Sequence, residues 1–333
     1  MLIPENLQTH LTDPYGRTID YMRIAVTSAC NLRCTYCLRE SDAEADRNPE
    51  SMDTTQIGRI IGVLGRMGIR KIRFTGGEPL LRRDLPELVA IARATPGIES
   101  IKLTTNGVLL EKRLPGLLGA GIDGINLSLD TLDPARFRSI ARRDEFPRVR
   151  RALDLLTETP SLKVKINVLL LRGVNDDEIP AFAELTRNRK ITVRFMELQP
   201  FDDHQIWRTG RFMGAEMIRE RLHLAFPDIE PITGRDTEHY SFRIPACIGS
   251  IAIIPAFSRN FCSRCSRLRI TAAGRLFSCL YRQESIDLMP ILKGDSPEEA
   301  LRRTIEDAIR RKPPDGLKSG NDHAVSSMSQ IGG

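Results

Sequence analysis

The sequence lacks any long apolar stretch. Its longest apolar runs, residues 168–171 and 251–257, are far too short to cross a bilayer. The first ten residues show no basic segment followed by an apolar one, so no export signal is visible. We therefore expect a cytoplasmic protein with no membrane partner, whose cysteines are reduced thiols.

Aromatic residues are also scarce, at 5% of the 333 residues, and no long run of Lys or Arg is present. The net charge is nevertheless +6, which favours an anionic partner. No aromatic signature of RNA binding accompanies this charge, so a small anionic substrate is favoured over nucleic acid. The alternative is a surplus of charge spread over solvated helix faces.

The seven cysteines form no even set for a disulfide framework, but six of them fall into two triads. Cys30, Cys34 and Cys37 are spaced C-x3-C-x2-C, and Cys262, Cys265 and Cys279 are spaced C-x2-C-x13-C. Each triad is one ligand short of a closed zinc site or of a cubane held by four thiolates. Three thiolates would leave one iron of a cubane open to a small molecule. Structural zinc is the alternative for either triad, and a fourth ligand from Cys247 is a further alternative for the second; otherwise Cys247 fills the core.

Six short β-rich runs, each followed by a helical pattern, predict parallel strands joined by right-handed crossovers. The expected strands cover residues 22–27, 71–75, 100–104, 124–129, 163–169 and 192–197. The expected helices include 111–118, 148–156, 177–186 and 215–224, and two more begin at capping boxes formed by Asp53 with Gln56 and by Asp84 with Glu87. An open doubly wound sheet and an incomplete (β/α) barrel both fit, and both place ligands beyond the C-terminal strand ends.

The first cysteine triad directly follows the first expected strand, and Gly76-Gly77-Glu78-Pro79 directly follows the second. C-x3-C-x2-C with an aromatic residue before the third cysteine, together with GGEP, resembles the radical S-adenosylmethionine (SAM) superfamily. Taken alone, GGEP could be an ordinary turn. The resemblance implies a [4Fe-4S] cluster on Cys30, Cys34 and Cys37 and SAM as the source of a 5′-deoxyadenosyl radical. It places SAM contacts at Tyr36, Gly77, Ser128 and Gln199, although the family often has an apolar residue at Gln199.

The second triad stands beside Arg267-Leu268-Arg269, and the chain ends in Gly332-Gly333. These features resemble the GTP 3′,8-cyclase family, which acts first in molybdenum cofactor biosynthesis. The resemblance implies a (β/α)6 TIM-like partial barrel over residues 1–210 and an extension over 211–333 that holds a second [4Fe-4S] cluster facing guanine. It places the Gly332-Gly333 tail toward the active site, where the alternative is a disordered end. The GTP contacts that it implies are Arg23, Arg73, Thr104, Lys165, Arg267 and Arg269.

Two of these contacts also stand out in the pattern, because Arg73 and Lys165 interrupt apolar strands, where a charge is costly unless it is partnered. Thr104 and Ser128 could instead cap strand ends.

The implied reaction removes hydrogen from C3′ of GTP and joins C3′ to C8, giving 3′,8-cyclo-7,8-dihydro-GTP. The implied partners are a low-potential electron donor such as flavodoxin and the next enzyme, cyclic pyranopterin monophosphate synthase, and the family allows a homodimer. The rival hypotheses are a peptide-modifying radical enzyme and a non-catalytic metal module that binds nucleic acid.

Overall fold

The computed structural model describes residues 11–37, 51–199, 209–232, 239–258, 262–282, 284–294 and 297–316. Our predictions for Gly332 and Gly333 therefore lie outside the described residues. Within the described part of the chain, no helix is both long enough and apolar enough to cross a membrane.

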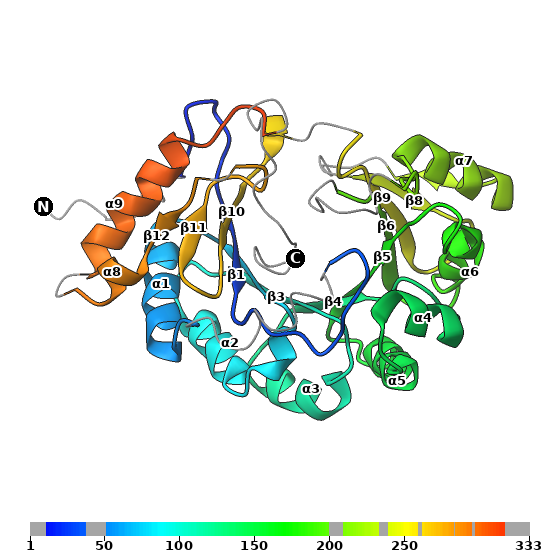
Figure 1. Cartoon of the computed structure of the whole chain (residues 1–333), viewed down its shortest axis with the longest axis horizontal. Coiled ribbons are helices and arrows are strands. Elements are labelled where there is room, and N and C mark those ends of the chain that lie inside the picture. Colours follow the sequence, from blue (N-terminus) through cyan, green and yellow to red (C-terminus); the bar gives the residue numbers. More distant parts are fainter. Residues whose placement is uncertain are drawn as a thin grey trace, which may run out of the picture.

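The strands in the described residues form one curved sheet of twelve (Figure 1). Its order is β12 (Ile286–Asp287), β11 (Arg275–Phe277), β10 (Arg267–Ile270), β1 (Tyr21–Ala25), β2 (Lys71–Thr75), β3 (Ser100–Thr105), β4 (Gly124–Ser128), β5 (Lys163–Leu169), β6 (Ile191–Met196), β9 (Ser250–Ile254), β8 (Tyr240–Arg243) and β7 (Glu230–Pro231). The strands β1 to β6 pair in parallel in chain order, which confirms the predicted partial barrel.

Strands from the C-terminal part of the chain extend this barrel at both edges. β10 pairs in parallel with β1, and β9 pairs in parallel with β6, so neither edge of the six-stranded core is left open. Neither of these two strands is among those expected from the sequence. The division of the chain near residue 210 stays a prediction.

The helices cover the convex side of the sheet, and the concave side faces the interior of the barrel (Figure 1). They are α1 (Thr54–Arg66), α2 (Leu85–Ala94), α3 (Leu110–Gly119), α4 (Pro134–Ala141), α5 (Phe146–Thr157), α6 (Ile179–Glu184), α7 (Ala215–Ala225), α8 (Met289–Leu292) and α9 (Pro297–Arg310), with 3-10 turns at η3 (Pro79–Leu81), η4 (Asp176–Glu178) and η5 (Cys262–Arg264). The helices α4, α8 and α9 are not among those expected from the sequence, and α9 packs on α1.

The two predicted capping boxes have different outcomes. The Asp53 carboxylate accepts from the Gln56 amide and the Gln56 side chain accepts from the Asp53 amide, which confirms the first box. The second prediction is wrong, because Asp84 makes no side-chain cap. Its carboxylate accepts hydrogen bonds from Arg82 and Thr54 instead, and the Arg82 bond is the main cause that lowers the pKa of Asp84 to about 2.

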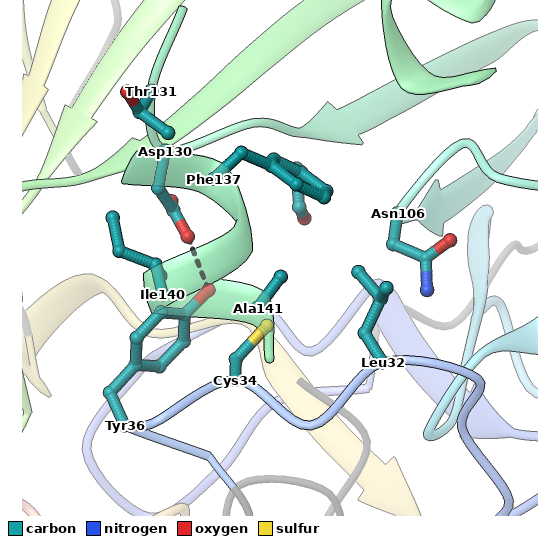
Figure 2. Close-up of a pocket in the computed structure, with 10 residues that line it drawn as sticks. Leu32, Cys34, Tyr36, Asn106, Asp130, Thr131, Phe137, Ile140 and Ala141 are labelled. Carbon is teal, nitrogen blue, oxygen red and sulfur yellow. Dashed lines mark hydrogen bonds between the residues drawn. The ribbon is translucent and has the colours of Figure 1, made fainter. Parts of the chain in front are cut away.

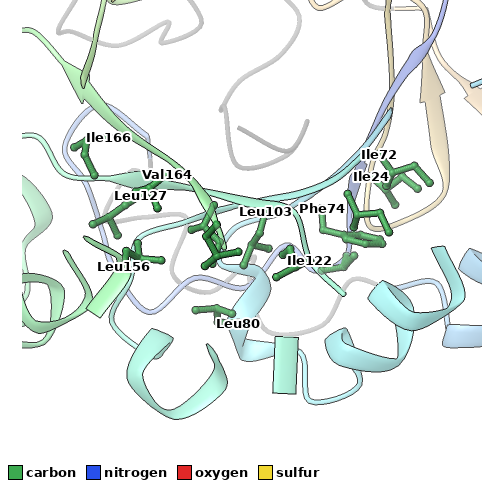
Figure 3. Close-up of a cluster of buried hydrophobic side chains, with 14 of the residues drawn as sticks. Ile24, Ile72, Phe74, Leu80, Leu103, Ile122, Leu127, Leu156, Val164 and Ile166 are labelled. Carbon is green, nitrogen blue, oxygen red and sulfur yellow. The ribbon is translucent and has the colours of Figure 1, made fainter. Parts of the chain in front are cut away.

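Alternation along the strands divides apolar from polar side chains. Ile24, Ile72, Phe74, Leu103 and Leu127 are all 0% exposed and point toward the helices (Figure 3). Because successive side chains of a strand point to opposite faces, the intervening residues line the concave side. Those residues are mostly polar, so the interior of the barrel is suited to polar ligands.

Candidate active site

The first cysteine triad lies on a loop that leaves the C-terminal end of β1. The backbone amides of Arg33 and Thr35 donate to the carbonyl oxygens of Ala141 and Ile140, at 3.0 and 2.9 Å. The amide of Cys37 closes a turn on the Cys34 carbonyl at 2.9 Å. The end of α4 therefore holds the loop, and the three thiols stay close together in space.

The charges around this loop suit three thiolates bound to a cationic group. Burial raises the pKa of Cys34 well above its usual value, and nearby Asp130, Cys37 and Cys30 raise it further. Three thiolates beside a carboxylate need positive charge, and iron would supply it. Among the described residues, no group of three Cys, His, Asp or Glu side chains is arranged around a single metal ion. Three thiols are the donor set that a [4Fe-4S] cluster with one open iron would take.

The Gly-Gly pair after β2 packs directly against the segment that leads into Cys30. The Gly77 amide donates to the Thr27 carbonyl at 2.9 Å, and the Glu78 amide donates to the Ala29 carbonyl at 2.8 Å. A Cβ atom on Gly77 would lie 2.3 Å from the Ser28 carbonyl oxygen, so no larger residue fits. The GGEP loop and the cysteine loop therefore form one unit.

Glu78 fixes this unit to the end of β3. Its carboxylate accepts from the Thr105 hydroxyl at 2.7 Å, the Asn106 amide at 2.7 Å and the Leu80 amide at 3.0 Å. Burial raises the pKa of Glu78 to about 7, against the opposing effect of these hydrogen bonds. Glu78 thus positions the loops that surround the first cysteine triad.

A pocket lies beside Cys34, and two predicted SAM residues, Tyr36 and Ser128, line it (Figure 2). The Tyr36 hydroxyl donates to the Asp130 carboxylate at 2.5 Å, and Asp130 also accepts from the Leu169 amide at 2.9 Å. Burial raises the pKa of Asp130 to about 6, although the Tyr36 hydrogen bond opposes that rise. The contact ties the cysteine loop to the ends of β4 and β5.

The other two predicted SAM residues lie on different segments. Gly77 lies on the loop that packs beside the first triad, as described above. Gln199 follows β6, and its side-chain amide approaches the Tyr281 hydroxyl at 3.5 Å. Tyr281 follows Cys279, so Gln199 lies near the second triad.

The second triad gathers around the start of β10. Burial raises the pKa of Cys262, and nearby Cys279 and Cys265 raise it further. The Gly316 amide donates to the Cys262 sulfur at 3.2 Å, and a Cβ atom on Gly316 would lie 2.5 Å from the Cys279 sulfur. A second set of three thiols is therefore assembled within reach of one backbone segment.

Cys247 is separate from both triads. It is 7% exposed and belongs to the hydrophobic core. This confirms the interpretation of Cys247 as core filler.

Cationic side chains cover the concave face between the two triads. Arg23 stands opposite Arg73 on β2 and Arg269 on β10, and Arg73 stands opposite Lys102 on β3. The cations at these concave positions are Arg23, Lys71, Arg73, Lys102, Lys163, Lys165, Arg194, Arg267 and Arg269. At the concave positions of the described strands β1 to β6, β9 and β10, no Asp or Glu occurs.

Burial of these like charges is costly without an anion. Burial, with Arg73 and Arg23 nearby, lowers the pKa of Arg194 to about 9. Burial and the charges of Arg23 and Arg267 lower the pKa of Arg269 well below its usual value. A bound polyanion would offset this repulsion, so the face is suited to phosphate groups.

All six predicted GTP contacts lie on this face or at its rim. Thr104 and Lys165 both stand opposite Asn126 of β4. The Asn126 amide, oriented to satisfy both of its polar atoms, accepts from Arg73 at 2.8 Å and from Arg194 at 3.1 Å. Arg194 is not among the contacts expected from the sequence, although it interrupts an apolar strand in the same way as Arg73 and Lys165.

Comparisons with known proteins place this architecture in a class. Residues 24–186 match the family described as "Radical SAM superfamily", and residues 191–317 match "Molybdenum Cofactor Synthesis C". The crystal structure of Streptococcus suis SuiB shares the fold with a TM-score of 0.59 at 16% identity, over 87% of this chain and 69% of that one. The three-cysteine loop after the first strand of such a barrel defines a radical SAM protein.

Curated relatives narrow the class to one family. A GTP 3′,8-cyclase of Chlorobaculum tepidum is 65% identical over 98% of both chains. The molybdenum cofactor biosynthesis protein 1 of Bos taurus is 37% identical over 91% of this chain and 48% of its own length. The chain belongs to the GTP 3′,8-cyclase family.

Proposed function

We propose that this chain is the enzyme that rearranges GTP to 3′,8-cyclo-7,8-dihydro-GTP in the first step of molybdenum cofactor biosynthesis. The observation that carries the proposal is a concave face set between two cysteine triads, with nine cations and no carboxylate at the described strand positions of β1 to β6, β9 and β10. A nucleoside triphosphate has the charge that such a face favours. A cytoplasmic location belongs to the same proposal.

At the first triad, the cluster and SAM supply a 5′-deoxyadenosyl radical when they are bound. Cys30, Cys34 and Cys37 are the proposed cluster ligands. Tyr36, Gly77, Ser128 and Gln199 are the proposed SAM contacts. We infer that the Tyr36–Asp130 hydrogen bond and the buried Glu78 keep this loop assembly in place while SAM binds and leaves.

At the second triad, Cys262, Cys265 and Cys279 are the proposed ligands of a second [4Fe-4S] cluster whose open iron meets guanine. Arg23, Arg73, Thr104, Lys165, Arg267 and Arg269 are the proposed GTP contacts. Forming a C3′–C8 bond requires ribose and base of one nucleotide to be held in a fixed relation. Binding the triphosphate and the guanine base at separate points would hold the ribose and the base in that fixed relation. Positioning the substrate is therefore the main contribution of the protein.

The remaining elements of the proposal concern partners. A low-potential donor such as flavodoxin would supply electrons, and cyclic pyranopterin monophosphate synthase would take the product. We propose that the Gly332-Gly333 tail lies toward the active site, and a homodimer is compatible with the family.

Anaerobic reconstitution tests the function directly. The protein should hold about eight irons, and it should release 5′-deoxyadenosine and the cyclised nucleotide only when reductant, SAM and GTP are all present. Cys279→Ser should lose about half of the iron while SAM binding remains. Cys247→Ala is the matched control, because Cys247 lies in the core, and it should keep all of the iron. SAM cleavage that is independent of GTP and stimulated by a peptide would contradict the proposal.

A further inference from the structure

Tyr21 lies buried inside the cationic face, with 6% of its surface exposed. The guanidinium carbons of Arg23, Arg73 and Arg267 lie 5.8, 5.6 and 6.0 Å from the centre of its ring. The Lys71 ammonium lies 5.1 Å from the same centre. The Tyr21 hydroxyl also accepts a hydrogen bond from Arg23 Nε at 3.3 Å. One aromatic ring thus contacts four cations from three strands.

The strand register produces this arrangement. Tyr21 stands opposite Lys71 on β2 and opposite Arg267 on β10, one on each side. Arg23 follows two residues later and therefore projects from the same face of β1. Cations near an aromatic face are attracted by the charge distribution of the ring, and more strongly when they are desolvated.

The charges around Tyr21 also change its acidity. Burial by itself would raise the pKa of the phenol, but the positive charges of Arg73, Arg23 and Arg267 lower the pKa to about 7. Several cationic side chains on the packed strands surround Tyr21. Those near its ring are Arg23, Lys71, Arg73 and Arg267. Those whose pKa its negative charge would raise are Lys102, Arg194 and Arg269. At the described concave strand positions, Tyr21 is the one side chain that can become an anion near neutral pH.

We propose that Tyr21 is a positioning residue for the triphosphate: its ring supports the guanidinium groups, and its phenolate balances their charge until the substrate binds. This inference rests on the proposed function. A bound triphosphate would repel the phenolate, so the phenolate would take up a proton from solution and become the neutral phenol. Binding should therefore weaken as pH rises above 7, because the phenolate then competes with the triphosphate for the same guanidinium groups.

Two variants separate the ring from the hydroxyl. In the anaerobically reconstituted enzyme, Tyr21→Leu removes both and should raise KM for GTP about tenfold, with a smaller change in kcat. Tyr21→Phe keeps the ring and should stay within about threefold of the wild type near pH 7. Tyr15→Phe is the matched control, because Tyr15 also lies 5.3 Å from an arginine but is 55% exposed. Iron content and SAM binding should be equal in all four proteins.

The pH dependence of triphosphate binding tests the role of the Tyr21 hydroxyl. The titration of Lys102 must be eliminated from this measurement by substitution. Burial and nearby Arg73 and Lys71 lower the pKa of Lys102 to about 8, so its titration would overlap. We therefore compare Lys102→Met with the double variant that also carries Tyr21→Phe. Binding of inorganic triphosphate should weaken from pH 7 to 9 in the single variant and change little in the double variant.

Equal slopes in those two proteins, or wild-type kinetics in Tyr21→Leu, would overturn the proposed role. Loss of iron in Tyr21→Leu would overturn it too, because Tyr21 would then support the second cysteine loop. Failure of the wild type to convert GTP would count against the proposed function instead. The binding of inorganic triphosphate would still decide the role of Tyr21.

Discussion

The guanidinium group of Arg17 donates to the carbonyl oxygen of Cys262 at 2.6 Å, across 245 residues of sequence. Its second terminal nitrogen donates to the Pro313 carbonyl at 2.7 Å, and its Nε pairs with Asp13 at 2.5 Å. Arg17 and Asp13 are each 5% exposed. One buried ion pair therefore joins the N-terminal segment, the second cysteine loop and the segment that passes Cys279.

We predict that Arg17→Ala selectively weakens the second cluster. Removing Arg17 leaves the Asp13 carboxylate buried without its partner, which costs about 3–5 kcal/mol, and it releases the Cys262 carbonyl. Iron content should fall toward that of one cluster, while SAM binding at the first site persists. Iron analysis and Mössbauer spectroscopy of the reconstituted variant would measure this.

Arg66→Ala is the control for that variant. Arg66 pairs with Glu298 at 2.7 Å, but both side chains are more than half exposed. Its loss should change stability by less than about 1 kcal/mol and leave all of the iron in place. Equal loss of iron from both clusters in Arg17→Ala would contradict the predicted selectivity, because both clusters would then depend on the contacts of Arg17.

Much of the barrel could be predicted from the sequence because its signals are local. The six central strands lie within two residues of the expected ranges, since each is an apolar run bounded by turn residues. The first cysteine loop and GGEP each follow a strand directly, and parallel strands bring those ends together. The contacts that close the second site, from Arg17 and Gly316, join distant segments and leave no local pattern.

Other omissions have a different physical origin. β9 and β10 pair with β6 and β1 of the central sheet. Both are short strands that follow the change in composition after residue 199, and the sequence of such a strand does not indicate its partner strand. Asp84 was misassigned because Arg82, two residues earlier, takes the carboxylate that a helix cap would need. Arg194 carried the same signal as Arg73, a charge between buried strand residues, and the same argument would have found it.

We predict that Arg194→Ala weakens GTP binding. Arg194 shares Asn126 with Arg73, and a charge-assisted contact to phosphate is worth about 1.5–3 kcal/mol, so KM should rise roughly tenfold to hundredfold. Arg194→Lys should restore only part of this loss, because lysine cannot make a bidentate contact.

Arg187→Ala is the control for the loss of Arg194, since Arg187 pairs with Glu184 at 2.6 Å on the surface. It should bind GTP as the wild type does. If Arg194→Ala bound GTP normally, the triphosphate would have to lie on another part of the concave face.

We predict that the substrate is the free nucleoside triphosphate and not its magnesium complex. Magnesium prefers carboxylate and phosphate oxygens, and the described concave strand positions supply cations but no carboxylate. At fixed total GTP, the rate should fall as magnesium exceeds GTP, and a chelator should not lower it. Sodium chloride at matched ionic strength is the control, because salt also screens the charges. A strict requirement for magnesium would contradict this prediction.

The buried carboxylate of Glu78 should make stability depend on pH. Its pKa is raised from 4.5 to about 7 in the folded chain, so the folded state binds a proton more tightly than the unfolded state. The stability contributed by this proton is complete below pH 4.5 and is lost as pH rises through 7. A difference of this size corresponds to about 3 kcal/mol between the two limits.

Glu78→Gln removes that titration. The unfolding temperature of the wild type should fall between pH 5.5 and 8, and the fall should be smaller in the variant. The variant also places an amide against the donors at Leu80, Thr105 and Asn106, and this cost is the same at every pH. The pH slope therefore isolates the carboxylate, whereas the absolute stability does not. Glu87→Gln is the control, because Glu87 lies on the exposed face of α2, and its unfolding temperature should depend on pH as that of the wild type does. If the unfolding temperatures of Glu78→Gln and the wild type fell in parallel, Glu78 would be ionised throughout this pH range, which would contradict the prediction.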